Sequence, residues 1–328
     1  MLSYRKLAMR VPGRPLHTGG NDSPRPASQR AAAFILTAAM LTTFTAPAFA
    51  GTWYIEDGNI TVKAGETGND VTQNNVTTKN DTNTIITNRE DKASSNTVTI
   101  DANGKNDKVE VTLKDVNIDT SSRNKAAVSV TGEGDTNIKL NGDNALKSDI
   151  YRSGIYGSGI YGSGSGSLTI SGGENDSLTA QGGSGANGIS SSGSLTISGG
   201  TVTANGDDGG RGISSSGGVT ISGGSTVTAN GGNGGSLIGG DGIRSGGGLT
   251  VSDGTVTAKG GNGDSKDGYG GDGIRSGGVV TISGNTVNAA GGNGGKVGGY
   301  GICSFDRVAI SGGTVNAAGG NSSYGGGD

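Results

Sequence analysis

Apolar and polar residues alternate in short segments that recur through the second half of the chain. Five such segments begin at Ile189, Ile213, Ile243, Ile274 and Ile302, which are 24, 30, 31 and 28 residues apart. Each segment holds an Ile-x-Ser run, an apolar doublet such as Leu-Thr-Ile, and a Thr-Val-Thr-Ala or Thr-Val-Asn-Ala run. Alternation over so few residues predicts strands. Glycine-rich loops absorb the variation in spacing, which is typical of stacked repeats.

Three short strands in each repeat of 24–31 residues predict an all-β fold, a right-handed parallel β-helix in which each repeat forms one coil. Consecutive coils of such a solenoid stack about 4.8 Å apart through parallel backbone ladders. The alternation also assigns the residues that face the interior. These are Leu195, Ile197, Val202 and Ala204 and their equivalents in later coils, through to Val308, Ile310, Val315 and Ala317.

Weaker copies of the pattern extend toward the N-terminus. Apolar doublets at Val111, Ile138 and Leu168 are 27 and 30 residues apart, which matches the later period. We therefore expect β-helix repeats over residues 96–328, with about eight coils, or nine with Thr97–Ile100. Residues 51–95 are predicted to be an N-terminal cap or irregular leading coils. The C-terminus could be native or truncated, and an open strand edge there would permit self-association.

The N-terminal segment has the pattern of an export signal. Residues 1–30 carry six basic residues and one acid, and an uncharged apolar run from Ala31 ends in Ala48-Phe49-Ala50. This arrangement predicts a signal peptide over residues 1–50 with cleavage after Ala50. The alternative is a membrane anchor, which Pro47 and several threonines disfavour. We expect a secreted or cell-surface protein whose mature form has no membrane span.

Charge and composition exclude several classes of function. Residues 1–50 hold six of the 25 Lys and Arg and one of the 28 Asp and Glu, which leaves 19 basic and 27 acidic residues, a net charge of −8. Such a surface argues against nucleic acid as a partner. The single histidine, His17, lies in the predicted signal peptide, so histidine-based catalysis and histidine-ligated zinc are excluded in the remainder. The single cysteine, Cys303, excludes an internal disulfide.

The stretch VTLKDVNIDTSSRNKAAVSVTGEGDTNIKLNGDNALKS, followed by SGSLTISGG and the GGNGG and GI-x-S repeats, resembles a bacterial family of secreted β-helix proteins described as containing a carbohydrate-binding domain. The resemblance runs from about Val98 to the C-terminus. It implies a fold like that of pectate lyases and a polysaccharide-binding or adhesive role. Some members bind acidic plant polysaccharides with calcium and without cleavage, which makes calcium a possible ligand here.

A repeated Gly-Asp-Gly-Ile-Arg motif marks the first candidate site. Asp241 and Arg244 recur one coil later as Asp272 and Arg275, with Arg211 nearby in the preceding coil. Stacked coils would turn these residues into an Asp ladder and an Arg ladder. Such ladders could bind calcium or a uronate, because calcium prefers several oxygen ligands and arginine suits carboxylates. The alternative is a solvated, mutually neutralising charge strip.

The loop Gly260–Gly273 offers a second candidate. It brings Asp264, Asp267 and Asp272 close in sequence to Tyr269. The acids could hold calcium while Tyr269 stacks on a sugar ring, although a plain flexible loop is the alternative. The alternation also places Cys303 in an outward column, which contains Ser190, Ser214, Arg244, Arg275 and Cys303.

Taken together, these patterns predict an exported, non-catalytic carbohydrate-binding or adhesin-like protein. The expected partner is a polysaccharide or cell-surface glycan, and we expect it to be acidic. Two alternatives stay open, because a fold alone does not define a function. One is a purely structural surface rod, and the other is a polysaccharide lyase or hydrolase with paired carboxylates.

Overall fold

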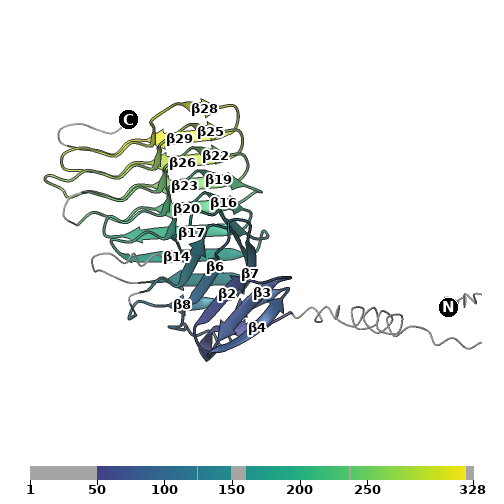
Figure 1. The fold of residues 1–328 in the computed structure, drawn as a ribbon. Coiled ribbons are helices and arrows are strands. Elements are labelled where there is room, and N and C mark those ends of the chain that lie inside the picture. Colours follow the sequence, from purple (N-terminus) through teal and green to yellow (C-terminus); the bar gives the residue numbers. More distant parts are fainter. Residues whose placement is uncertain (1–49, 124, 149–159, 236–237, 323–328) are drawn as a thin grey trace, which may run out of the picture. The chain divides into compact units, whose positions relative to one another are not determined.

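The computed structural model describes residues 50–123, 125–148, 160–235 and 238–322, all of which belong to one compact unit. Its regular structure is almost entirely β (Figure 1). Within these residues the single helix is the short 3-10 turn η1 (Ile55–Asp57). The predicted signal peptide lies outside the described residues except for Ala50.

The strands form three sheets, each of which collects one strand from each coil (Figure 1). Sheet A contains β4 (Val76–Asp81), β3 (Asn69–Gln73), β2 (Ile60–Ala64), β6 (Val98–Ala102), β9 (Val128–Gly132), β12 (Ile160–Gly162), β15 (Ile189–Ser191), β18 (Ile213–Ser215), β21 (Ile243–Ser245), β24 (Ile274–Ser276) and β27 (Ile302–Ser304). Sheet B contains β1 (Thr52–Tyr54), β5 (Thr84–Thr87), β7 (Lys108–Lys114), β10 (Asp135–Asn141), β13 (Leu168–Ser171), β16 (Leu195–Ser198), β19 (Val219–Ser222), β22 (Leu249–Val251), β25 (Val280–Ile282) and β28 (Val308–Ile310). Sheet C contains β8 (Asn117–Asp119), β11 (Asp143–Lys147), β14 (Ser177–Ser184), β17 (Thr201–Asp207), β20 (Thr226–Asn230), β23 (Thr255–Lys259), β26 (Thr286–Ala290) and β29 (Thr314–Ala318).

The predicted fold class is confirmed: the chain is a parallel β-solenoid of about nine turns with three strands in each coil. The register also follows the sequence repeat, since Ile197 pairs with Ile221, and Val202 pairs with Val227. Because side chains alternate between the faces of a strand, this register stacks like residues in the interior. The resulting core is one continuous cluster of buried Ile, Val, Leu and Ala.

The last coil is less buried than the others, and one predicted alignment between coils is wrong. Val308 and Ile310 keep the inward register, but they are 44% and 54% exposed, and Val315 and Ala317 are also uncovered. They belong to the last described coil, whose strands β27, β28 and β29 lie at the ends of the three sheets. Ile138 pairs with Ile170 rather than with Leu168.

The difference between the predicted and the observed partner of Ile138 has a local cause. Leu168 pairs with Thr136, a threonine that is 1% exposed and takes an inward position where the later coils have Leu or Val. The Thr136 hydroxyl has no hydrogen-bond partner within the described part of the chain. The hydrophobic pattern therefore begins two residues late in this coil.

Buried serines in sheet A connect several of the later coils to the coil before each of them. The hydroxyl of Ser245 donates to the carbonyl oxygen of Gly217 or Gly248, at 3.1 and 2.9 Å. Ser276 repeats this arrangement one coil later, with acceptors at 3.0 and 2.9 Å. These hydrogen bonds satisfy backbone oxygens at the corner between sheets A and B, which explains the serine of the Ile-x-Ser motif.

The long loops between sheets C and A are held together by backbone hydrogen bonds. The N–H of Gly240 donates to the oxygen of Gly232 within one loop, and the N–H of Gly261 donates to the oxygen of Gly240 across to the next loop. Gly271 continues the series by donating to Gly261. The outgoing and returning arms of successive loops thus form a zigzag ladder, in which glycine allows the backbones to approach closely.

Asparagines of the GGNGG motif add a second ladder at the loops. The side-chain oxygen of Asn233 accepts the backbone N–H of Asn262 at 2.8 Å. In the same way, the side chain of Asn262 accepts the N–H of Asn293, and the side chain of Asn293 accepts the N–H of Asn321, both at 2.8 Å. The repeated asparagine is therefore explained by coil-to-coil pairing.

The N-terminal part departs from the regular coil. Strand β2 pairs in parallel with β6 of the following coil, whereas β3 and β4 extend sheet A by antiparallel pairing. Strand β1 pairs in parallel with β5 at the end of sheet B.

Candidate ligand-binding site

The outer face of sheet A carries the predicted column of polar side chains. Ser190, Ser214, Arg244, Arg275 and Cys303 are consecutive partners in the parallel ladder of β15, β18, β21, β24 and β27. Their neighbours in the Ile-x-Ser motif face inward and are buried in all but the last coil. Arg244 and Arg275 therefore lie one above the other on a rigid sheet.

Asp241 and Asp272 precede this column by three residues, where the glycine loop returns to sheet A. One oxygen of Asp241 accepts the backbone N–H of Asp272 at 3.0 Å, and one oxygen of Asp272 accepts the N–H of Tyr300 at 2.8 Å. Two coils before Asp241, the side-chain oxygen of Asn187 accepts the backbone N–H of Arg211 in the same way. The position before Gly-Ile thus forms a side-chain ladder that connects coils.

The remaining carboxylate oxygens bind guanidinium groups. Asp241 Oδ2 lies 3.3 Å from Arg211 Nε and 3.9 Å from Arg244 Nη1, and Asp272 Oδ2 lies 3.0 Å from Arg275 Nη1. The two acid side chains are 11% and 5% exposed, whereas those of the arginines are 33–45% exposed. The buried acids consequently hold three arginines that still reach solvent.

These groups line one cavity of about 560 Å³. The lining also includes loop residues that pair as isolated parallel bridges, from Ile238 to Tyr269 and from Tyr269 to Val297. Tyr300 is also exposed there. The structure therefore brings all five predicted ligand-binding residues together, which are Asp241, Arg244, Tyr269, Asp272 and Arg275.

The electrostatics of the cavity favour an anion. Three arginines face two aspartates, which leaves one net positive charge. Burial lowers the pKa of Arg244, and the nearby positive charge of Arg211 lowers it further. Burial likewise raises the pKa of Asp272, with the charge of Asp241 as a further cause. Among the described residues, the acid paired with Arg244 is Asp241 at 3.9 Å, so the positive charge of Arg244 is the least compensated of the three.

The calcium prediction receives no support from the placement of its residues. One oxygen of Asp264 accepts the backbone N–H groups of Lys266 and Asp267 at 2.8 and 3.1 Å, and these bonds lower its pKa. Asp272 is already bound to Tyr300 and Arg275. Across the described ranges, no three acid, cysteine or histidine side chains are grouped to hold a metal ion. Calcium at Asp264, Asp267 and Asp272 stays a prediction.

Apart from glycines, three residues that line the cavity were not predicted from the sequence: Ile238, Val297 and Tyr300. Tyr300 could have been found, because it occupies the position before Gly-Ile that holds Asp241 and Asp272 in earlier coils. Ile238 and Val297 lie in loops of different length, so only backbone pairing reveals that they align with Tyr269.

Cys303 provides a test of the outward column. It is partly exposed, and burial raises its pKa, with the charge of Asp272 as the next cause. We expect a thiol reagent to label Cys303 in the folded protein, but more slowly than in denaturant, because less thiolate is present. Mass spectrometry after timed labelling near pH 8 measures both rates. Complete protection of the folded protein would contradict the outward position.

None of the described helices is long and apolar enough to cross a membrane. Comparison of the chain with protein-family models, curated proteins and solved structures finds no match.

Proposed function

We propose that this protein is an exported, non-catalytic carbohydrate-binding or adhesin-like solenoid whose cavity holds an acidic glycan. The observation that carries the proposal is the group of Arg211, Arg244 and Arg275, fixed by buried aspartates beside Tyr269 and Tyr300. Guanidinium groups bind carboxylates with paired, charge-assisted hydrogen bonds. Aromatic rings provide a flat apolar surface with a polar tip, which suits a sugar face.

The scaffold supports this role. Neighbouring coils repeat at about 4.8 Å, so charged groups on adjacent coils form a regular row that suits a repeating polymer. Sites on strands are held more precisely than sites on loops. The resemblance to secreted carbohydrate-binding β-helix proteins points to the same partner class.

A non-catalytic role is favoured by how the two acids are used. Glycoside hydrolysis needs two carboxyl groups that are free to exchange protons or attack the sugar. Asp241 and Asp272 are both bound to backbone N–H groups and to arginines. Their geometry fits a positioning role for the arginines.

The test is binding to polygalacturonate, compared with a neutral polysaccharide, with calcium and with chelator. We expect Arg244→Ala and Arg275→Ala each to weaken binding at least about tenfold, because each removes a charge-assisted contact. Lys114→Ala removes one positive charge from an exposed position on sheet B and serves as the control.

Other outcomes separate the alternatives. Binding to polygalacturonate that occurs with calcium and is lost when chelator is added would support the calcium prediction. Equal binding by all three variants would contradict the arginine site, and absence of binding to any polysaccharide would favour a structural surface rod. Release of unsaturated or reducing-end products would identify a lyase or hydrolase.

A further inference from the structure

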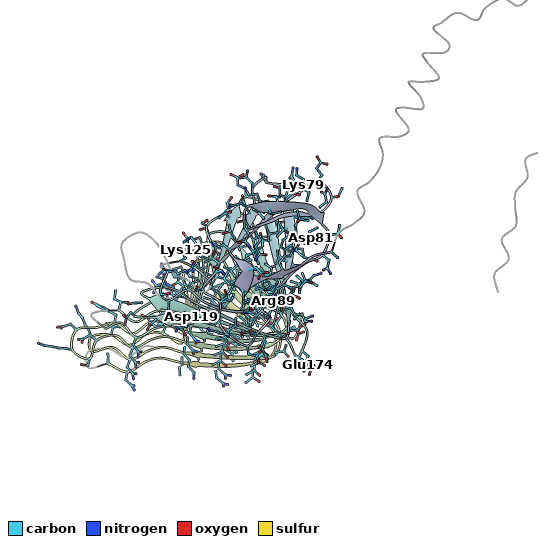
Figure 2. All side chains as sticks on the ribbon, turned by 90° about the horizontal axis from the view of Figure 1, so that it is seen from below. Lys79, Asp81, Arg89, Asp119, Lys125 and Glu174 are labelled. Carbon is cyan, nitrogen blue, oxygen red and sulfur yellow. The ribbon has the colours of Figure 1, made fainter. Side chains whose placement is uncertain are left out.

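A buried carboxylate that forms no ion pair with the described residues lies beside the predicted cleavage point. Asp81, which is labelled in Figure 2, lies at the end of β4 and is fully buried. Its Oδ1 accepts the backbone N–H of Gly51 at 2.9 Å and that of Asn83 at 3.1 Å, and its Oδ2 accepts the indole N–H of Trp53 at 2.8 Å. No lysine or arginine of the described residues forms an ion pair with it.

This arrangement is energetically unusual. A buried charge is normally paired, because its loss of hydration is costly. Three neutral donors satisfy the hydrogen-bonding capacity of Asp81 only in part, and none of them carries a compensating charge.

Gly51 is held in place from both sides. Its N–H donates to Asp81, and its carbonyl oxygen accepts the N–H of Ile85, the residue that pairs with Thr52 in the ladder of β1 and β5. Gly51 is buried, whereas Ala50 is exposed. The chain thus passes from the surface to the interior at the Ala50–Gly51 bond, which is the bond that the export signal predicts to be cut.

We propose that cleavage after Ala50 is a maturation step that converts the amide nitrogen of Gly51 into an ammonium group paired with Asp81. Hydrolysis adds one water across the Ala50–Gly51 bond, releasing the Ala50 carboxylate with the presequence and leaving the α-amine on Gly51. A free α-amine is mostly protonated at neutral pH. Its nitrogen already lies at hydrogen-bond distance from Asp81 Oδ1, so the ion pair needs no rearrangement of β1.

The remaining protons of the ammonium can be hydrated. Loss of the exposed residue Ala50 opens the surface on that side of Gly51. Asp81 connects the first strand of sheet B with the antiparallel hairpins of sheet A, so the new ion pair would fasten the N-terminal end of the solenoid. The proposal is independent of the glycan-binding function.

The first experiment is to export the full chain from a bacterial host and to determine the N-terminal residue by mass spectrometry. We expect Gly51. The exported protein is then compared with a chain that retains Ala50, in which Gly51 keeps an amide nitrogen. Trp53 is the single tryptophan and donates to Asp81, so its fluorescence reports unfolding at this site.

We expect retention of Ala50 to lower the thermal midpoint reported by Trp53 by about 3 °C or more. Asp81→Asn should remove the difference between the two chains, whereas Asp91→Asn, at an exposed position, should preserve it. If Asp81→Asn does not fold, acylation of the α-amine replaces it as the test, and slower acylation in the folded than in the unfolded chain is expected. Cleavage at another bond, or equal midpoints for the two chains, would overturn the proposal.

Discussion

Replacement of Gly261 by alanine is expected to lower the free energy of unfolding by about 3 kcal/mol. A Cβ added at Gly261 would lie 1.9 Å from the carbonyl oxygen of Gly232 in the preceding loop. That oxygen accepts the N–H of Gly240, whose own oxygen accepts the N–H of Gly261. Because backbone atoms on both sides are fixed, the clash can be relieved only by separating the loops and breaking these hydrogen bonds.

A matched control lies in a neighbouring loop. A Cβ added at Gly235 would meet no atom within 4 Å, so Gly235→Ala should change stability by less than about 0.5 kcal/mol. Denaturant unfolding followed by circular dichroism measures both variants. Similar stability of the two variants would mean that the glycine ladder is not closely packed in solution.

The sequence was sufficient to predict the three sheets because the repeat contains two independent signals, one for the strands and one for their register. Period-two alternation marks each strand, and the constant spacing from Ile213 to Val219 and from Ile243 to Leu249 sets the register. The prediction failed in the coil of Thr136, where a polar residue occupies an inward position and hides the start of the apolar pattern.

The loops were less predictable for a physical reason. A ladder made only of backbone groups, such as that of Gly232, Gly240 and Gly261, leaves no pattern of side-chain types beyond glycine itself. The repeated Asp-Gly-Ile-Arg motif predicted which charged groups would be neighbours. It did not reveal that Asp241 and Asp272 bind backbone N–H groups, since that depends on the depth at which the loop returns to the sheet.

Replacement of Asp272 by alanine is expected to have the second-largest effect, a loss of about 2–3 kcal/mol. The Asp272 side chain is 5% exposed and accepts both the N–H of Tyr300 and the guanidinium of Arg275. Its removal leaves a backbone donor unpaired and a partly buried positive charge without its acid. Arg275 remains about one-third exposed, so solvent reduces the cost of the unpaired charge below that of a wholly buried pair.

Two further variants separate these contributions. Asp272→Asn keeps an oxygen for the N–H of Tyr300 but removes the negative charge, so its loss of stability should be smaller than that of alanine. Asp267→Ala, at an exposed position of the same loop, should leave stability nearly unchanged. Unfolding curves measure these differences, and equal stability of Asp272→Ala and Asp267→Ala would contradict the role of the aspartate ladder.

The same variants distinguish a positioning role from a purely structural one. If Asp272 fixes Arg275 for an anionic ligand, Asp272→Asn should weaken polygalacturonate binding while the solenoid remains folded. Phe305, whose ring lies 5.0 Å from the Arg275 guanidinium, would still contact this side chain. Unchanged affinity in a folded Asp272→Asn variant would show that ligand binding does not depend on the orientation of Arg275. Arg211 and Arg244 would then be the arginines expected to contact the ligand.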